Sequence, residues 1–145
     1  MTIMKKMILL ACLILMGMTM CACSYTNPIA EEYSNETCIV IENMATDRLI
    51  SIGMTRYIDD VAVGSTGMAN ANGSIIEEES IPFAFQEEDF PADSKLEKFA
   101  VQVSVSEEDG TTYELDKLYI PFEFGKDIFI ELTYKDGTYF VRETQ

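Results

Sequence analysis

The sequence predicts an all-β domain, an antiparallel β-sandwich of about seven to nine strands that fills residues 37–145. Three observations lead to this fold class. Short apolar or alternating segments recur at intervals of roughly 8–12 residues, which is the spacing of strands in a sandwich. Turn residues, including two Asp-Gly pairs, separate these segments. No segment beyond residue 37 has the extended apolar period of a helix.

The first strands are predicted from continuous and alternating apolar residues. Residues 37–43, TCIVIEN, form a β-branched run. Such a run suits a central strand, because a strand buried on both faces is apolar throughout. A short turn leads into a second strand over 49–58. Asp59-Asp60 separates that strand from a third over 61–68.

The middle of the chain is predicted to change sheets. Isoleucine and phenylalanine alternate with other residues over 80–86, which indicates a strand with one apolar face. Residues 87–98 lack a regular period, and we expect them to cross from one sheet to the other. One helical turn, capped by Asp93 or Ser94, is predicted within this crossing.

The last third of the chain is predicted to form two hairpins. Phenylalanine and valine occupy every second position over 99–105, and an Asp-Gly pair joins this strand to a return strand over 111–118. Apolar residues alternate again over 120–124, where a proline favours an edge position. A second Asp-Gly turn joins strands over 128–134 and 138–143.

Two sheets that each bury one face account for this pattern, and an immunoglobulin-like sandwich is the preferred form. The chain contains no Trp, so the Cys-Trp-Cys hallmark is absent and the prediction concerns the architecture alone. Each large buried side chain contributes on the order of 1.5–3 kcal/mol. Such a core can stabilise one domain without disulfides.

The N-terminus predicts a lipoprotein signal peptide. Lys5 and Lys6 precede an apolar run over 7–20, which is shorter than the roughly 20 residues that a membrane-spanning helix needs. The run ends in Met-Cys-Ala-Cys and resembles the bacterial lipobox, although the methionine and the first cysteine depart from its usual residues. Cleavage is predicted between Ala22 and Cys23, with acyl chains such as palmitate attached to Cys23. An uncleaved anchor helix is the alternative.

The chain therefore divides into three predicted parts: a signal peptide (1–22), a lipidated cysteine with a flexible polar tether (23–36), and the sandwich domain (37–145). A tether of this length reaches roughly 20 Å. Alternatively, its tyrosine and isoleucine side chains dock onto the domain. Acyl chains on Cys23 would attach the protein to the lipid bilayer on the extracytoplasmic side, since two buried chains anchor stably.

The exported part is strongly acidic. The chain has 10 Lys and Arg and 25 Asp and Glu, and only Lys5 and Lys6 leave with the signal peptide. Eight basic and 25 acidic residues remain, which gives a net charge of −17. Nucleic-acid phosphates attract basic surfaces, so this charge argues against nucleic-acid binding. The simplest explanation of this negative charge is that it keeps the domain soluble.

The composition also excludes several kinds of chemistry. The chain has no His, which excludes Ser-His-Asp and Cys-His catalysis and His-ligated zinc. We expect no enzymatic activity and no cofactor. Cys38 is the only cysteine after residue 23, so no intrachain disulfide is expected. Its apolar neighbours predict a buried structural thiol.

Two loops are candidates for contact with a partner, and they span residues 64–74 and 87–91. The candidate residues of the first loop are all glycine or asparagine: Gly64, Gly67, Asn70, Asn72 and Gly73. Turn or bulge geometry is the simpler explanation of these residue types.

Three acidic clusters, at 77–79, 87–89 and 107–109, are candidates for calcium binding through oxygen ligands. None has the alternating spacing of a calcium loop, and acidic residues beside turns are usually solvated. Paired carboxylates could also hydrolyse a glycan across a cleft. No metal site is predicted.

Five segments together carry a resemblance: the lipobox, the polar tether, IENMATDRLISIGMTRYIDD, GSTGMANANGS and FAFQEEDFP. They resemble a group of small lipoproteins of Gram-positive gut bacteria that have one immunoglobulin-like domain of unknown function. The resemblance implies no activity and no cofactor. We expect a membrane-anchored, non-catalytic binding or assembly module of the cell envelope, with a protein or glycan partner. The alternative is a small calcium-dependent or carbohydrate-active factor.

Overall fold

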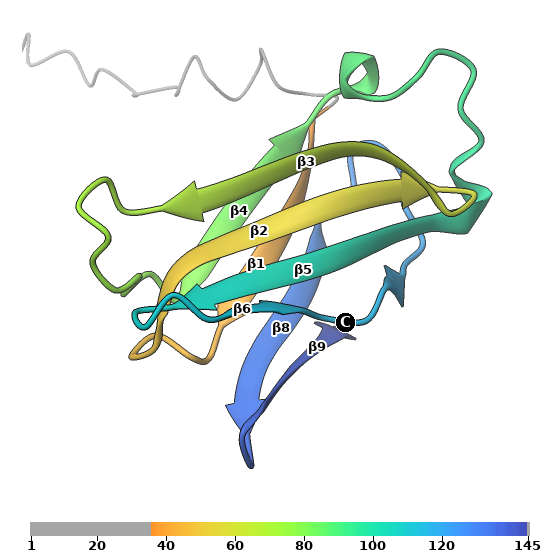
Figure 1. Ribbon diagram of the computed structural model, residues 1–145. Helices are drawn as coiled ribbons and strands as arrows, with labels where there is room; N and C mark the ends of the chain where they lie inside the picture. The colour runs from red at the N-terminus through yellow and green to blue at the C-terminus, as the bar shows by residue number, and fades with distance from the viewer. Residues whose placement is uncertain (1–35, 145) are drawn as a thin grey trace, which may run out of the picture. The chain divides into compact units, whose positions relative to one another are not determined.

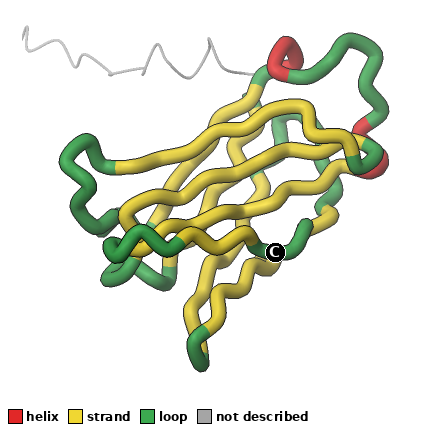
Figure 2. Tube along the Cα trace, viewed as in Figure 1, coloured by secondary structure: helices red, strands yellow, loops and turns green. Residues whose placement is uncertain are grey.

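The computed structural model describes residues 36–144, which form two β-sheets around one core (Figure 1, Figure 2). The first sheet, in the order β4-β1-β8-β9, contains β1 (Thr37–Asn43), β4 (Ser80–Phe85), β8 (Ile128–Lys135) and β9 (Thr138–Thr144). The second sheet, in the order β3-β2-β5-β6, contains β2 (Leu49–Ile58), β3 (Val61–Ala69), β5 (Phe99–Glu107) and β6 (Thr112–Glu114). β7 (Leu118–Tyr119) also pairs with β5.

These nine strands confirm the predicted fold class, an all-β sandwich. The strands of the two sheets cross in Figure 1, instead of lying nearly parallel. The predicted signal peptide (1–22), with Ala22 at its end, lies outside the described residues. The same is true of Cys23 and of the tether up to residue 35.

The likeness to immunoglobulin domains is one of architecture. β1 and β8 run parallel, with Ile39 opposite Ile128 and Ile41 opposite Ile130, so the first sheet is mixed. All other strand pairs among the described residues are antiparallel. The strand order also differs from the ABED and CFG sheets of immunoglobulin constant domains.

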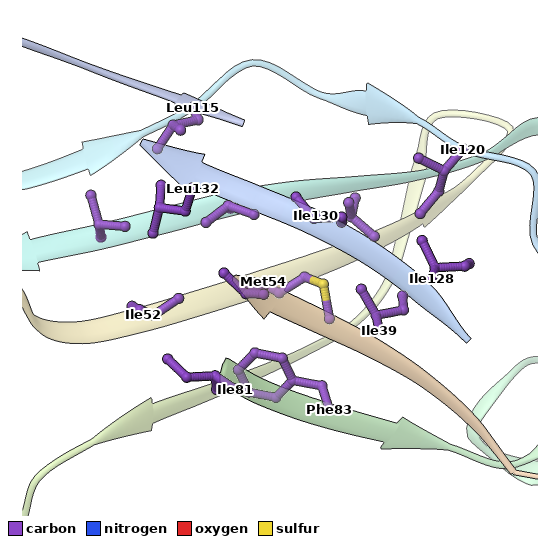
Figure 3. Close-up of a cluster of buried hydrophobic side chains, with 14 of the residues drawn as sticks. Ile39, Ile52, Met54, Ile81, Phe83, Leu115, Ile120, Ile128, Ile130 and Leu132 are labelled. Carbon is purple, nitrogen blue, oxygen red and sulfur yellow. The ribbon is translucent and has the colours of Figure 1, made fainter. Parts of the chain in front are cut away.

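Alternate residues of the central strands form the core, as their sequence pattern predicts. On β5, the inward residues Phe99, Val101, Val103 and Val105 are at most 1% exposed. Figure 3 shows side chains from both sheets meeting in this layer, among them Ile39, Ile52, Met54, Ile130 and Leu132. Close packing of these side chains stabilises the sandwich without a disulfide.

The predicted edge strand over 120–124 is wrong. Only Leu118–Tyr119 of this part of the chain pairs with β5, and residues 120–124 then leave the sheet without forming a strand. Ile120 still donates its backbone N–H to Phe99 O (3.1 Å), but Pro121 has no N–H to continue a ladder. The alternating apolar residues of this segment, Ile120 and Phe122, nevertheless reach the core.

The crossing between β4 and β5 is confirmed, but its local structure differs from the prediction. It contains two 3₁₀ turns, η1 (Glu87–Asp89) and η2 (Leu96–Lys98). Neither Asp93 nor Ser94 caps a turn, because the residue before η2 is Lys95 and it makes no side-chain cap. Ser94 Oγ instead donates to Pro91 O (2.6 Å).

The sandwich has two chemically different ends, set by the antiparallel pairing of β2 with β5. Ile58 lies opposite Phe99 at one end, and Leu49 lies opposite Glu107 at the other. The first end, here called the phenylalanine end, contains a cluster of five rings: Phe85, Phe90, Phe99, Phe122 and Phe124. The second, the tyrosine end, contains a cluster of polar and aromatic side chains: Arg48, Glu107, Tyr113, Tyr134 and Tyr139.

Candidate functional site

A groove of about 580 Å³ lies at the phenylalanine end, along the crossing between β4 and β5. Its floor is buried or half-buried and comes from Phe90, Leu96 and Phe124, whereas the other apolar lining residues, Pro91 and Ala92, are exposed. Its acidic lining is exposed and includes Glu87 and Glu88 of η1. The groove therefore combines an aromatic floor with a negatively charged rim, and it includes the second of the predicted partner loops, 87–91.

The fold of η1 positions the floor of this groove. Gln86 donates its backbone N–H to Asp89 Oδ2 (2.8 Å), and Asp89 donates its own N–H back to Gln86 O (3.0 Å). This tight turn directs Phe90 inward, where its ring lies 5.2 Å from Phe122 and 5.4 Å from Phe124. Because Phe90 packs against the core, the floor is rigidly tied to the sandwich, whereas the acidic rim faces solvent.

Arg56 of β2 lies beneath the same crossing. Its guanidinium lies 4.5 Å from the centroid of Phe85 and 5.1 Å from that of Phe90, and Nη1 donates to Asp89 O (3.2 Å). Only 8% of the residue is exposed, and Nε has no hydrogen-bond partner among the described residues. Burial lowers the pKa of Arg56 from its ordinary value, and the nearby Asp89 charge opposes this shift.

Arg56 was not among the residues predicted from the sequence, although a signal was present. Arg56 has the same strand parity as Met54 and Ile58, so the alternation of β2 already places it on the inward face. The room for its guanidinium comes from β3, where a Cβ on Gly64 would collide with Arg56 Nη2. The sequence signal for this buried arginine was therefore an inward Arg56 on β2 together with a glycine, Gly64, opposite it on β3.

The first predicted partner loop divides into a strand and a turn. Gly64 and Gly67 belong to β3 and not to a loop. Gly67 lies close to the β2 backbone, since its Cβ would approach Ile52 O to 3.1 Å. Both glycines therefore serve the contact between β2 and β3.

The other residues of that loop shape the turn after β3. Asn70 Nδ2 donates to Ile75 O (2.9 Å), and Asn72 Oδ1 accepts the Ser74 N–H (3.0 Å). Gly73 has a φ of +70°, which glycine adopts without strain. Turn geometry is thus sufficient to explain all three residue types.

The acidic clusters do not converge into a metal site. Among residues 36–144, no group of three or more Cys, Asp or Glu side chains is arranged to hold a metal ion. Glu107 instead accepts hydrogen bonds at the tyrosine end, and Asp109 Oδ1 accepts the Thr111 N–H (2.8 Å) in the hairpin turn. Glu77, Glu78 and Glu79 are exposed.

The tyrosine end has a polar network. Glu107 Oε1 accepts from Arg48 Nη2 (3.0 Å) and from the Tyr139 hydroxyl (2.5 Å), and the Arg48 guanidinium lies 3.9 Å from the Tyr134 ring centroid. The hydrogen bonds from Tyr139 and Arg48 hold the pKa of Glu107 below its ordinary value. Burial, followed by the hydrogen bond to Glu107, raises the pKa of Tyr139 to about 12. This network joins the two sheets.

Cys38 is half-buried, so the prediction of a buried thiol is wrong. It is the second residue of β1, and its backbone N–H donates to Asp127 Oδ1 (3.0 Å). Burial, and then the charges of Asp127 and Glu36, raise the pKa of the Cys38 thiol. A raised pKa keeps the thiol protonated, which makes it a poor nucleophile.

No protein-family model, curated protein or solved structure matches the chain. The resemblance to small Gram-positive lipoproteins therefore remains a prediction from the sequence. Within residues 36–144, no helix is both long and apolar enough to span a bilayer.

Proposed function

We propose that the protein is an extracytoplasmic lipoprotein, anchored through acylated Cys23, that acts as a non-catalytic binding module of the cell envelope. The groove at the phenylalanine end is the proposed binding site. The observation that carries this proposal is the combination of an aromatic floor, formed by Phe90 and Phe124, with an exposed acidic rim at Glu87 and Glu88.

The lining of the groove suits a ligand that carries an apolar group beside a positive charge. Aromatic rings attract cations through their electron-rich faces and also accept aliphatic groups. The acidic rim and the net charge of the domain raise the local concentration of cations. A basic segment of an envelope protein with apolar side chains has this chemistry.

The groove lies at the end where the chain enters the domain. β1 begins at Thr37, which lies opposite Phe85, and Thr37 Oγ1 accepts the Gly125 N–H (2.7 Å). Gly125 directly follows Phe124 of the groove floor. Under the proposed anchoring, the tether joins the domain beside the binding site.

Site-specific photo-crosslinking in whole cells tests the binding site. A photoreactive residue at Ala92, which lines the groove, should give one reproducible crosslinked partner. Charge reversal of the rim in a Glu87→Lys, Glu88→Lys variant should abolish that product. The same group at Phe140, which is 51% exposed on β9, is the matched control. Crosslinking from Phe140 alone would place the site on the first sheet, and crosslinking from neither position would contradict a binding role.

Metabolic labelling with a radioactive fatty acid tests the anchor. The wild-type protein should be labelled and should fractionate with membranes, and a Cys23→Ala variant should lose both properties. A Cys21→Ala variant is the control and should retain the label. Label that persists in the Cys23→Ala variant would place the anchor elsewhere.

A further inference from the structure

Four edges border the two sheets within residues 36–144, and three of them are protected against pairing with another strand. β4 carries Pro82, which cannot donate to a ladder. β9 carries the charged residues Arg142 and Glu143. The edge beside β5 consists of β6 and β7, which are only 3 and 2 residues long. Proline, charge and short length are common means of preventing association between sheet edges.

β3 is the edge without these protections. It is 9 residues long, contains no proline and no charged residue, and pairs only with β2 among the described residues (Figure 1). The whole segment between Asp60 and Glu77 is uncharged. A bulge interrupts the ladder near the start of β3, but residues 64–69 pair with β2 in continuous register. The outer backbone groups of these residues are therefore available to another strand.

The side chains of β3 also suit an added strand. Ser65, Gly67 and Ala69 are exposed and small, so they do not obstruct a neighbouring backbone. Met68 lies on the other face, is half-buried and packs against the core. An added strand would extend both faces, with apolar residues beside Met68 and small or polar residues beside Ser65 and Gly67.

We propose that the β3 edge binds an extended segment of a basic partner protein, which adds a strand to the second sheet. Main-chain hydrogen bonds would provide affinity, and alternate side chains would provide selectivity. The charge of the partner follows from one end of the edge, where the exposed glutamates 77–79 follow the turn after β3. At the other end, Asp59 and Asp60 already pair with Lys98 (3.8 Å) and Lys117 (3.2 Å). Basic residues at the end of an added strand beside 77–79 would complement the glutamates.

The same charges argue against pairing of two copies of this chain. In an antiparallel pair of β3 strands, Asp59 and Asp60 of each copy would approach residues 77–79 of the other. The Ile76 N–H donates to Leu49 O (2.7 Å), which holds the start of this acidic segment near the far end of β3. Lys98 and Lys117 offset the charges of Asp59 and Asp60, but each copy carries a strong net negative charge, which disfavours association.

Nuclear magnetic resonance with a designed peptide tests this proposal on the full chain in detergent micelles. The probe alternates threonine and valine and carries two lysines at each end. It should shift the backbone amide signals of residues 64–69 and slow their hydrogen exchange. The same peptide with alternate backbone amides methylated should not bind, since it lacks the ladder donors. Glutamates in place of the lysines should weaken binding by about tenfold or more.

A matched pair of protein variants separates the edge from the rest of the surface. Ala69→Lys places a charge at an exposed position of the edge strand and should weaken probe binding by about tenfold or more. Ala84→Lys makes the same change at an exposed position of β4 and should leave binding unchanged. Equal binding of the methylated peptide, or signal shifts confined to residues outside β3, would overturn the proposal. Self-association that Ala69→Lys abolishes would also overturn it, since the edge would then bind a second copy.

Discussion

The two ends of the sandwich use an arginine in different ways. Arg48, just before β2, lies against the Tyr134 ring and donates to Glu107, which gives its charge a carboxylate partner. Arg56, near the other end of β2, also lies against aromatic rings, but within residues 36–144 its only hydrogen-bond partner is a backbone oxygen. One end is therefore held by a charged hydrogen-bond network and the other by ring packing around a buried cation.

This difference predicts how each end responds to perturbation. Ring packing depends on side-chain volume, because a close-packed interior loses stability whenever volume is removed or added. Phenylalanine does not titrate, so this packing is insensitive to pH. The network that joins Arg48, Glu107 and Tyr139 contains groups with perturbed pKa values, so its contribution depends on pH. The phenylalanine end should thus be more sensitive to changes of size, and the tyrosine end to changes of protonation.

The largest effect is expected from Phe99→Ala. Phe99 is 1% exposed and its ring lies 4.6 Å from that of Phe122, so truncation leaves a cavity in the centre of the ring cluster. We expect the free energy of unfolding to fall by about 3–5 kcal/mol. Urea denaturation of the full chain measures it. Phe140→Ala, at a residue that is 51% exposed, is the control and should have little effect.

Gly64→Ala should have the next largest effect, since the added methyl group would collide with the Arg56 guanidinium. We expect a loss of about 1–3 kcal/mol, typical of overpacking. The double variant with Arg56→Met should recover most of this loss, because methionine is shorter than arginine and lacks the guanidinium that the added methyl group would meet. A double-mutant cycle measured by denaturation checks this coupling. Simple additivity of the two substitutions would contradict the proposed collision.

Tyr139→Phe tests the hydrogen-bond network of the tyrosine end. It removes the hydroxyl that donates to Glu107 and should lower the free energy of unfolding by about 1 kcal/mol. Tyr119→Phe is a matched control, because its hydroxyl also donates to a carboxylate, that of Asp60 (2.6 Å), but the residue is 57% exposed. We expect no measurable change there. If Tyr139→Phe and Tyr119→Phe lowered the thermal unfolding temperature equally, burial of the tyrosine–carboxylate hydrogen bond would be unimportant.

Arg56→Met alone should have a small effect. It removes a buried cation whose Nε is unpaired, and it also removes the contacts with Phe85 and Phe90. Because the cost of burying the charge offsets these contacts, we expect the free energy of unfolding to change by less than about 1 kcal/mol. Urea denaturation of the Arg56→Met variant measures this change in the free energy of unfolding. A loss of several kcal/mol would show that ring contacts outweigh the cost of burial.

The pH dependence of stability should come from the tyrosine end. The lowered pKa of Glu107 contributes stability above its ordinary pKa of roughly 4.3, and this contribution is lost as the pH falls through the lower value in the folded state. The raised pKa of Tyr139 contributes stability that is lost as the pH rises from roughly 10, the ordinary value, to about 12. The stability difference between wild type and Tyr139→Phe should therefore shrink at both extremes. A constant difference across pH would contradict this account.

Much of the fold could be predicted because its signals are local. The predicted strands over 37–43 and 49–58 have the observed bounds of β1 and β2, and both Asp-Gly turns join the expected hairpins. The segment 120–124 misled the prediction, because an alternating apolar pattern reports burial and not hydrogen bonding. Ile120 and Phe122 are buried although the backbone of the segment leaves the sheet.

The candidate site was less predictable. Residues 87–91 were identified as one candidate loop, but the groove also needs Leu96 and Phe124, which come from other parts of the chain. Gly64 and Gly67 were wrongly assigned to a loop, since a glycine in a strand and a glycine in a loop look alike in sequence. Only the strand pairing shows that Gly64 faces Arg56.

Four properties could be inferred from the amino-acid sequence alone: the all-β class, most strand bounds, the acidic charge and the lack of histidine chemistry. These properties follow from composition and from preferences of neighbouring residues, which any window of the chain expresses. The tertiary structure decided that β1 lies parallel to β8, that β3 is an exposed edge, and that one arginine finds a carboxylate while the other does not. Such features depend on contacts between residues far apart in the chain, and local patterns carry no information about which distant strand becomes a neighbour.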